Sequence, residues 1–235
     1  MHQVYVGTSG WAYASWKPDF YPAKLPAKKL LDHYATRLNA VEVNYTFRAN
    51  PRASTLDGWI ASTSPDFRFA AKANQRLTHI RRLKPSQEEV RWFFEALRPL
   101  ADAHRLGPIL FQLPPNFKAD RDVLASFLKL LPRGQLYAFE YRDPSWFEEP
   151  ILSLLRDENV ALCIAESDEL VTNEIHTANF AYFRLRKSDY SDADIQQIEQ
   201  RIKAAAIERD VFAFFKHEET PEGALNALKV RNALG

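Results

Sequence analysis

Charged side chains recur at the ends of apolar, strand-like runs along the whole sequence. The carboxylates are Glu42, Glu140 and Glu166, and the cations are Lys72, Arg142, Arg184, Arg186 and Lys216. Buried charges are costly unless they are paired or bind something. Carboxylates set among cations can transfer protons, and surplus cations bind anions. This pattern therefore predicts a ligand site that favours small anions.

Eight short β-type runs alternate with helical segments from one end of the sequence to the other. The predicted strands span residues 3–7, 40–45, 67–72, 107–113, 136–142, 160–166, 180–186 and 210–216. Helix starts are predicted by the capping-box spacing of Ser86 and Glu89 and by Ser191. The segment 167–179 is too short and polar for a regular helix.

This order predicts an α/β fold, a TIM-type (β/α)8 barrel with one degenerate helix after strand six. The barrel is expected to form one domain over residues 1–235, because no linker or repeat divides the chain. A doubly wound sheet is the competing fold. It is disfavoured because no strand is followed by its glycine-rich nucleotide-binding pattern.

Alternation along each strand decides which side chains face the barrel lumen. Apolar Val41 and Val43 suit the helix side, so Glu42 and Asn44 are predicted to point inward. The same parity turns inward Lys72, Gln112, Glu140, Arg142, Glu166, Arg184, Arg186 and Lys216. If Glu166 points inward, the same alternation turns Cys163 toward the helices. Barrel enzymes keep their active sites at the carboxyl ends of the strands, so we expect one shared site there.

The first strand is followed by an aromatic, glycine-containing loop, VGTSGWAYASW (residues 6–16). Ser9 lies on the inward side of that strand. Strands one and five lie on opposite sides of an eight-stranded barrel, so this loop can face the YRDPSW loop (141–146). Trp11 or Trp16 and Trp146 would then form aromatic walls above the charges, with Tyr13 beside them. The alternative is a structural plug, in which these rings pack against neighbouring loops.

Bulk composition excludes several classes of function. The net charge of +1 gives no global reason for binding nucleic acid or a membrane surface, and no apolar run approaches the about 20 residues of a membrane span. A single cysteine and unpaired histidines predict no disulfide, no metal site and no cofactor. The N-terminus lacks a secretion signal, so a cytoplasmic location is expected. The oligomeric state stays open.

Several segments of the sequence match one known family. They are VGTSGWAYASWKPDFYP, VEVNYTF, FRFAAKANQRLTH, LGPILFQLPPNF, FEYRDPSW and YFRLR. In these segments the chain resembles the domain of unknown function 72 family, also called YecE-like. The resemblance implies a TIM-type barrel and supplies no activity. The chain departs from the family pattern at Arg48, Arg186-Lys187 and Lys216-His217, and the last two changes add positive charge to the barrel mouth.

The leading hypothesis is a metal-independent enzyme, a hydrolase, lyase or isomerase, acting on a sugar phosphate or acidic sugar. Glu140 would be the general acid or base, Glu42 a second carboxylate, and Lys72 an electrophilic or Schiff-base amine. The predicted substrate-binding residues are Ser9, Trp11, Tyr13, Asn44, Gln112, Arg142, Trp146, Arg184, Arg186 and Lys216. A nucleic-acid-binding protein with an aromatic-lined, positive mouth is the alternative. A catalytically silent binding barrel is the third.

Overall fold

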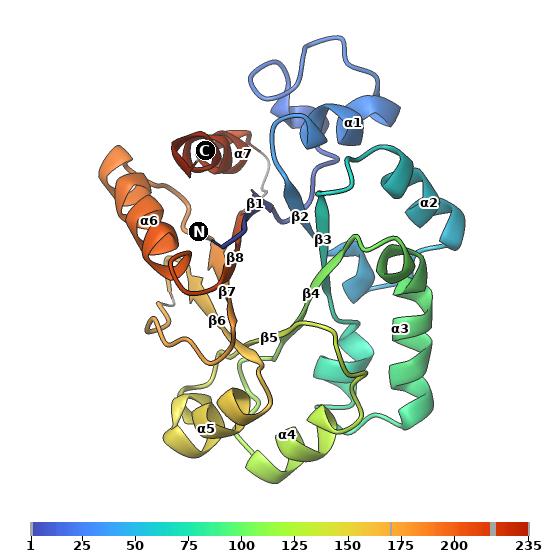
Figure 1. The fold of residues 1–235 in the computed structure, drawn as a ribbon, viewed down its shortest axis with the longest axis vertical. Coiled ribbons are helices and arrows are strands. Elements are labelled where there is room, and N and C mark those ends of the chain that lie inside the picture. Colours follow the sequence, from blue (N-terminus) through green and yellow to red (C-terminus); the bar gives the residue numbers. More distant parts are fainter. Residues whose placement is uncertain (1, 170, 217–219, 235) are drawn as a thin grey trace.

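The structure, a computed structural model, describes residues 2–169, 171–216 and 220–234. Eight parallel strands close into one barrel in chain order (Figure 1). They are β1 (Val4–Thr8), β2 (Ala40–Val43), β3 (Arg68–Lys72), β4 (Leu106–Gln112), β5 (Tyr137–Glu140), β6 (Ala161–Glu166), β7 (Phe180–Leu185) and β8 (Asp210–Phe215). Each begins and ends within one residue of its predicted range or inside it. The TIM-type barrel is therefore confirmed.

Helices surround the barrel (Figure 1). They are α1 (Leu30–Ala35), α2 (Ala53–Ala61), α3 (Gln87–Asp102), α4 (Arg121–Leu128), α5 (Glu149–Asp157), α6 (Asp192–Ala205) and α7 (Glu222–Leu234). The predicted capping box forms at α3, where the Ser86 hydroxyl accepts from the Glu89 backbone N–H and the Glu89 carboxylate accepts from that of Ser86. In the described part of the chain no helix connects β6 to β7, which confirms the degenerate unit after strand six.

Small and aromatic side chains fill the lumen below the charged mouth. They are Ala40, Ala70, Leu110, Ala138, Ala161, Cys163, Ala165, Tyr182, Phe212 and Phe214. Tyr5 stacks on Phe212 with ring centroids 4.6 Å apart. On several strands a charged residue follows one of these lumen residues two positions later, as Glu42 follows Ala40. The charged side chains therefore form the next layer of the lumen, at the carboxyl ends of the strands. This apolar layer seals the barrel and keeps water from approaching those charges from below.

The predicted orientation of β6 is wrong. Cys163 packs with the alanines of the lumen, whereas Leu162 and Ile164 pack against the helices. Glu166 consequently points outward, where its carboxylate accepts from Arg201 of α6 at 2.9 Å. The physical reason is volume, because alanine and cysteine fit the narrow lumen and the branched residues fill the wider layer outside. β6 is apolar on both faces, so alternation of polarity could not reveal its phase.

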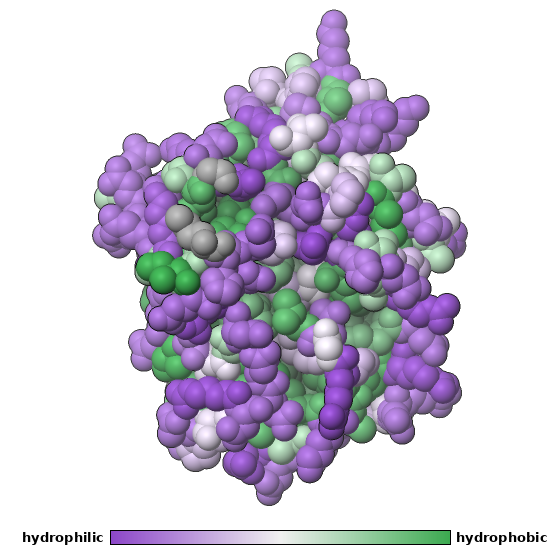
Figure 2. Space-filling model, in the orientation of Figure 1, coloured by the Kyte–Doolittle hydropathy of each residue, from purple (hydrophilic) through white to green (hydrophobic). Residues whose placement is uncertain are grey.

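Hydrophilic residues cover most of the face shown in Figure 2, with smaller apolar areas between them. The large apolar side chains that are exposed are scattered over the chain: Tyr45, Ile80, Trp92, Val171 and Ile207. Scattered residues of this kind are normal on a protein surface. Among the described residues, no helix combines the length and apolar character that crossing a bilayer requires.

Gly7 is required where β1 meets β2. A Cβ there would lie 1.9 Å from the carbonyl oxygen of Ala40, which is backbone and cannot move aside. We expect Gly7→Ala to lower the free energy of unfolding by about 1–3 kcal/mol, measured by denaturant titration. Gly58→Ala is the control, because nothing lies within 4 Å of a Cβ at that helical position. It should stabilise the protein by about 0.5–1 kcal/mol, and equal effects of the two changes would contradict this account.

Candidate functional site

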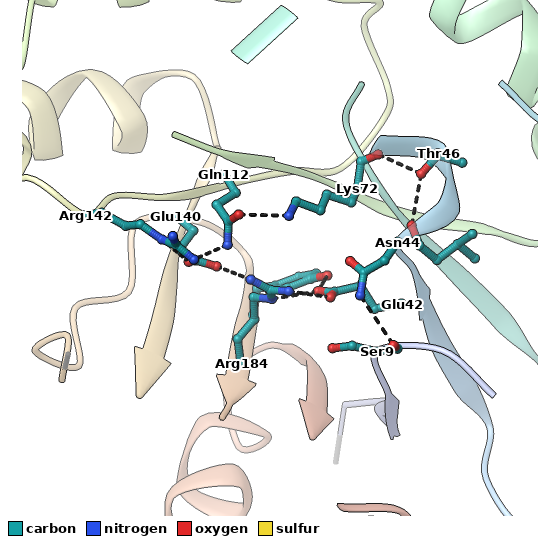
Figure 3. A network of polar contacts seen from close by, with 11 residues as sticks. Ser9, Glu42, Asn44, Thr46, Lys72, Gln112, Glu140, Arg142 and Arg184 are labelled. Atoms are coloured by element: carbon teal, nitrogen blue, oxygen red, sulfur yellow. Dashed lines mark hydrogen bonds and ion pairs between the residues drawn. The ribbon is translucent and has the colours of Figure 1, made fainter. Parts of the chain in front are cut away.

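A guanidinium shared by two carboxylates lies at the centre of the barrel mouth (Figure 3). Arg184, on β7, donates to Glu42 of β2 from Nε at 2.9 Å and from Nη2 at 2.7 Å. Its remaining nitrogen, Nη1, donates to Glu140 of β5. These three side chains are at most 3 % exposed. We call them the clamp, and it joins three strands across the lumen.

Further hydrogen bonds reach one carboxylate oxygen of each clamp glutamate. The Tyr182 hydroxyl donates to Oε2 of Glu42 at 2.7 Å. Gln112 Nε2 donates to Oε1 of Glu140 at 2.7 Å, and Arg142 Nε approaches the same oxygen at 3.3 Å. Charge-assisted bonds of this kind are about twice as strong as neutral ones. The two glutamates are therefore held rigidly and have no oxygen without a partner.

The clamp keeps both glutamates ionised. Burial alone would raise the pKa of Glu140, but the guanidiniums of Arg184 and Arg142 and the Gln112 amide hold it at about 2. Burial also opposes ionisation of Glu42, and Arg184 together with the Tyr182 hydroxyl lowers its pKa below the ordinary value. At neutral pH neither carboxyl carries a proton to donate. Their chemistry is to fix and neutralise Arg184.

Lys72, at the end of β3, has no carboxylate partner among the described contacts. Its Nζ donates to the neutral Gln112 Oε1 at 2.8 Å and lies 4.1 Å from the centre of the Phe47 ring. Burial, followed by repulsion from Arg184, lowers the pKa of Lys72 to about 8 although the clamp glutamates oppose the shift. An amine with this pKa is partly neutral near physiological pH and can act as a base or a nucleophile.

A short turn after β2 sets the surroundings of that amine. The Thr46 hydroxyl donates to the Lys72 backbone carbonyl at 2.6 Å, which fixes the turn Tyr45–Phe47 against β3. The Phe47 ring meets His79 edge-on at 5.0 Å. Burial and the neighbouring Lys72 lower the pKa of His79, so this imidazole is neutral at neutral pH. Sequence reasoning gave neither Phe47 nor His79 a role in the site, because no spacing connects them with Lys72.

Three polar atoms near the clamp are buried and have no hydrogen-bond partner in the described structure. They are Oγ of Ser9, Oδ1 of Asn44 and Nη1 of Arg186. Asn44 Nδ2 donates to the Ser9 carbonyl at 3.3 Å, and both residues lie beside Glu42 in Figure 3. A buried polar atom without a partner costs about 1–3 kcal/mol, so these three atoms are candidate contact points for a ligand.

The structure joins the predicted inward residues of strands two to five and seven in one network. Glu42, Lys72, Gln112, Glu140, Arg142 and Arg184 are linked by the contacts above. Arg186 lies close enough to both glutamates and to Arg142 to interact electrostatically. The sequence analysis missed Tyr182, although it shares a strand face with Arg184. The catalytic and binding roles of these residues remain predictions.

The expectation that Trp146 walls the mouth is wrong. Trp146 is fully buried, stacks on Tyr141 with centroids 4.8 Å apart, and donates to the Phe117 carbonyl. Trp16 is likewise buried, against Phe20 and other rings. The short helix that follows β5, Pro144–Phe147, turns its tryptophan into the helical layer.

Other predicted residues lie in two pockets at the edge of the network. Trp11 and Tyr13 line a pocket of about 570 Å³ with Ser9 and Asn44. Lys216 lines a separate pocket of about 60 Å³ with Lys187. His217 falls outside the described residues. No group of three or more His, Cys, Asp or Glu side chains is placed to hold a metal ion within the described ranges.

The fold and the mouth define a TIM-type barrel with a buried Glu–Arg–Glu clamp at the carboxyl ends of its strands. The sequence matches the family described as "Protein of unknown function DUF72" over residues 5–235. The chain therefore belongs to this family, and the resemblance seen in the sequence is confirmed.

Two curated relatives and one solved structure illustrate the relationship. UPF0759 protein YunF of Bacillus subtilis (strain 168) is 29 % identical over 185 residues, 74 % of this chain and 64 % of YunF. UPF0759 protein YecE of Escherichia coli (strain K12) is 31 % identical over 145 residues, 61 % of this chain and 50 % of YecE. A DUF72 family protein from Thermotoga maritima is 26 % identical, with a TM-score of 0.89 over 99 % of each chain. The matches thus span between half and two thirds of the curated relatives.

We expect Glu140 to couple the stability of the protein to acid. Because its pKa is depressed, its contribution is fully present above the ordinary value of 4.5 and is lost as pH falls toward about 2. Glu140→Gln, which leaves Arg184 with one carboxylate, should lower the unfolding free energy at neutral pH by about 3–5 kcal/mol. It should also flatten the fall in stability on acidification.

Denaturant titrations of the wild type and variants over this pH range measure both effects. Glu95→Gln is the control, because the Glu95 side chain is 63 % exposed and pairs with Arg91 on the same helix. If Glu140→Gln and Glu95→Gln lose stability with acid as steeply as the wild type, Glu140 does not carry the effect.

Proposed function

We propose that the protein is an enzyme that acts on a small anionic substrate, a sugar phosphate or an acidic sugar, at the barrel mouth. The observation that carries this proposal is the Lys72 amine, whose pKa is lowered to about 8 and whose hydrogen-bond partner is the neutral Gln112. Perturbed titratable groups of this kind concentrate at functional sites. Lys72 also lies where barrel enzymes hold their reacting groups.

The charge balance of the mouth supports an anionic substrate. Four cations, Lys72, Arg142, Arg184 and Arg186, face the two clamp carboxylates, which leaves a surplus of positive charge that is larger when Lys72 is protonated. Arg184 is neutralised by the clamp, so the surplus lies on the other three. Arg142 is 39 % exposed and reaches solvent at the mouth, and Arg186 has a nitrogen without a partner. A phosphate or carboxylate group bound there would balance this charge.

The electrostatics favour Lys72 over Glu140 for the acid–base role. A carboxyl with a pKa of about 2 neither donates a proton at neutral pH nor accepts one strongly. Lys72 can do both near its pKa. Protonated, it donates to a substrate oxygen; neutral, it accepts a proton or adds to a carbonyl carbon, and loss of water then gives an imine. Glu140 and Glu42 act as positioning residues that hold Arg184 and partly offset its repulsion of Lys72.

One observation favours the nucleic-acid alternative. Tyr45 is 58 % exposed at the rim, and Arg48 and Arg52 beside it in sequence are exposed as well. Exposed aromatic and basic residues together suit single-stranded nucleic acid. Binding of an oligonucleotide would weaken steeply with salt, whereas an enclosed small anion would respond less. Titrating a single-stranded oligonucleotide at two salt concentrations separates the two functions.

The proposal predicts a specific pH dependence for anion binding. Sulfate, which does not titrate in this range, should bind the wild-type protein more weakly as pH rises through about 8, because Lys72 loses its charge. Lys72→Met should weaken sulfate binding by about 10-fold at neutral pH, the loss of one charge-assisted hydrogen bond. In the variant, sulfate affinity should no longer change as pH rises through about 8; the wild type should show an inflection there. Isothermal titration calorimetry measures both quantities.

Lys84→Met is the matched control, because Lys84 is an exposed lysine with no part in the network. It should keep both the affinity and the inflection. Sulfate binding that is unaffected by Lys72→Met, or that shows no inflection in the wild type, would contradict the assignment. For the chemistry itself, borohydride reduction with a panel of ketose and aldose phosphates should attach a sugar to Lys72 if the imine forms.

A further inference from the structure

The pocket beside the clamp has the features of a built binding site. Its volume of about 570 Å³ lies in the range usual for ligand sites, about 300–1,000 Å³. Its lining comes from the loop after β1 and from the stretch that runs from the end of β2 into α2, and it includes Ser9, Trp11, Tyr13, Asn44 and Trp59. Ser9 and Asn44 belong to both the pocket and the network of Figure 3, so the two are continuous.

Two unsatisfied oxygen atoms lie in the lining of this pocket. The Ser9 side chain is fully buried and its hydroxyl has no partner in the described structure, nor has the Asn44 carbonyl oxygen Oδ1. Oδ1 can only accept a hydrogen bond, and the Ser9 hydroxyl can donate or accept. A ligand that fits must therefore offer a donor to Asn44 and a second polar group to Ser9. Two neighbouring hydroxyl groups meet both requirements.

The aromatic lining forms a corner. Trp11 and Trp59 meet edge to face, with centroids 5.1 Å apart and planes at 90°. A flat base would be sandwiched best between parallel rings, whereas a corner suits a puckered ring that presents C–H groups to one face. Gly10 shapes this corner: its φ is +115°, and a Cβ there would lie 2.6 Å from the Tyr13 hydroxyl. The positive φ at residue 10 is the stronger reason for glycine there, because the Tyr13 hydroxyl is the far end of a side chain that can shift.

We propose that this pocket is a subsite for a sugar ring, which stacks in the corner of Trp11 and Trp59 and hydrogen-bonds through two hydroxyl groups to Ser9 and Asn44. The inference rests on the proposed function, because it places the uncharged part of the substrate while the mouth cations bind its anionic group. Tyr13 connects the two parts, since it lines the pocket and lies within electrostatic range of Arg186. The substrate class becomes a monosaccharide carrying phosphate or carboxylate.

The test compares probes that share an anionic group and differ in the ring. Inorganic phosphate, glucose 6-phosphate, ribose 5-phosphate, glucuronate and adenosine monophosphate are titrated against the full-length protein by calorimetry. The sugar phosphates should bind at least about 10-fold more tightly than inorganic phosphate, which corresponds to about 1.4 kcal/mol. Ser9→Ala and Asn44→Ala should each remove most of that advantage and leave the affinity for inorganic phosphate unchanged.

A second readout separates this role from a structural one. Removing an unpartnered buried hydroxyl should leave the free protein as stable as the wild type or more stable, so Ser9→Ala should weaken sugar binding without lowering the melting temperature. Ser126→Ala, on the exposed side of α4, is the control and should change neither quantity.

The outcomes distinguish the two proposals. If inorganic phosphate binds but the sugar phosphates bind no more tightly, the sugar subsite is refuted and the anion site stands. If adenosine monophosphate alone gains affinity and Asn44→Ala removes the gain, the pocket takes a nucleobase and the sugar assignment is wrong. If phosphate, every sugar phosphate and glucuronate all fail to bind the wild-type protein, the proposed function fails, and the subsite fails with it.

Discussion

The Arg184 guanidinium spans the barrel lumen between Glu42 and Glu140, and the charge state of the whole mouth depends on this bridge. The clamp directs both carboxylates toward Arg184, and Glu140 also accepts from Arg142, so neither carboxylate pairs with Lys72 among the described contacts. Lys72 is left with an amide as its partner, so burial lowers its pKa instead of a salt bridge raising it. A buried charge pair of this kind adds little net stability over apolar packing. Here the pair holds the Arg184 charge in place and leaves the Lys72 amine available for chemistry.

The barrel supplies what the clamp requires. Parallel strands bring β2, β5 and β7 together at their carboxyl ends, although Glu42 and Arg184 are 142 residues apart in the sequence. The apolar layer of Tyr182, Phe212 and Phe214 below the clamp keeps the lumen dry, which strengthens every electrostatic interaction above it. The loop after β1 has two roles. Trp16 packs inside the protein, whereas Trp11 and Tyr13 line the pocket that continues the mouth.

The alternation of eight strand-like runs with helical segments was sufficient to predict the barrel. Strand parity predicted most of the clamp network, because β2, β3, β5 and β7 each carry a polar residue on one face only near their carboxyl end. It failed at β6, where both faces are apolar and the choice depends on side-chain volume in a closed barrel. It also failed at Trp146, because the direction of a loop after its strand depends on tertiary packing. The role first given to Glu140 could not be judged from the sequence, since its pKa is set by three partners from distant segments.

The account depends most directly on the ionisation of Lys72. Titration of the lysine side chains by NMR measures it, with the Lys72 signal assigned by its absence in Lys72→Met and the exposed lysines as internal references. The account predicts that Lys72 titrates at a pKa of about 8. It also predicts that Glu140→Gln lowers this value further, because a neighbouring negative charge is removed. A Lys72 that titrates with the exposed lysines, near the ordinary value of 10.5, would contradict the account.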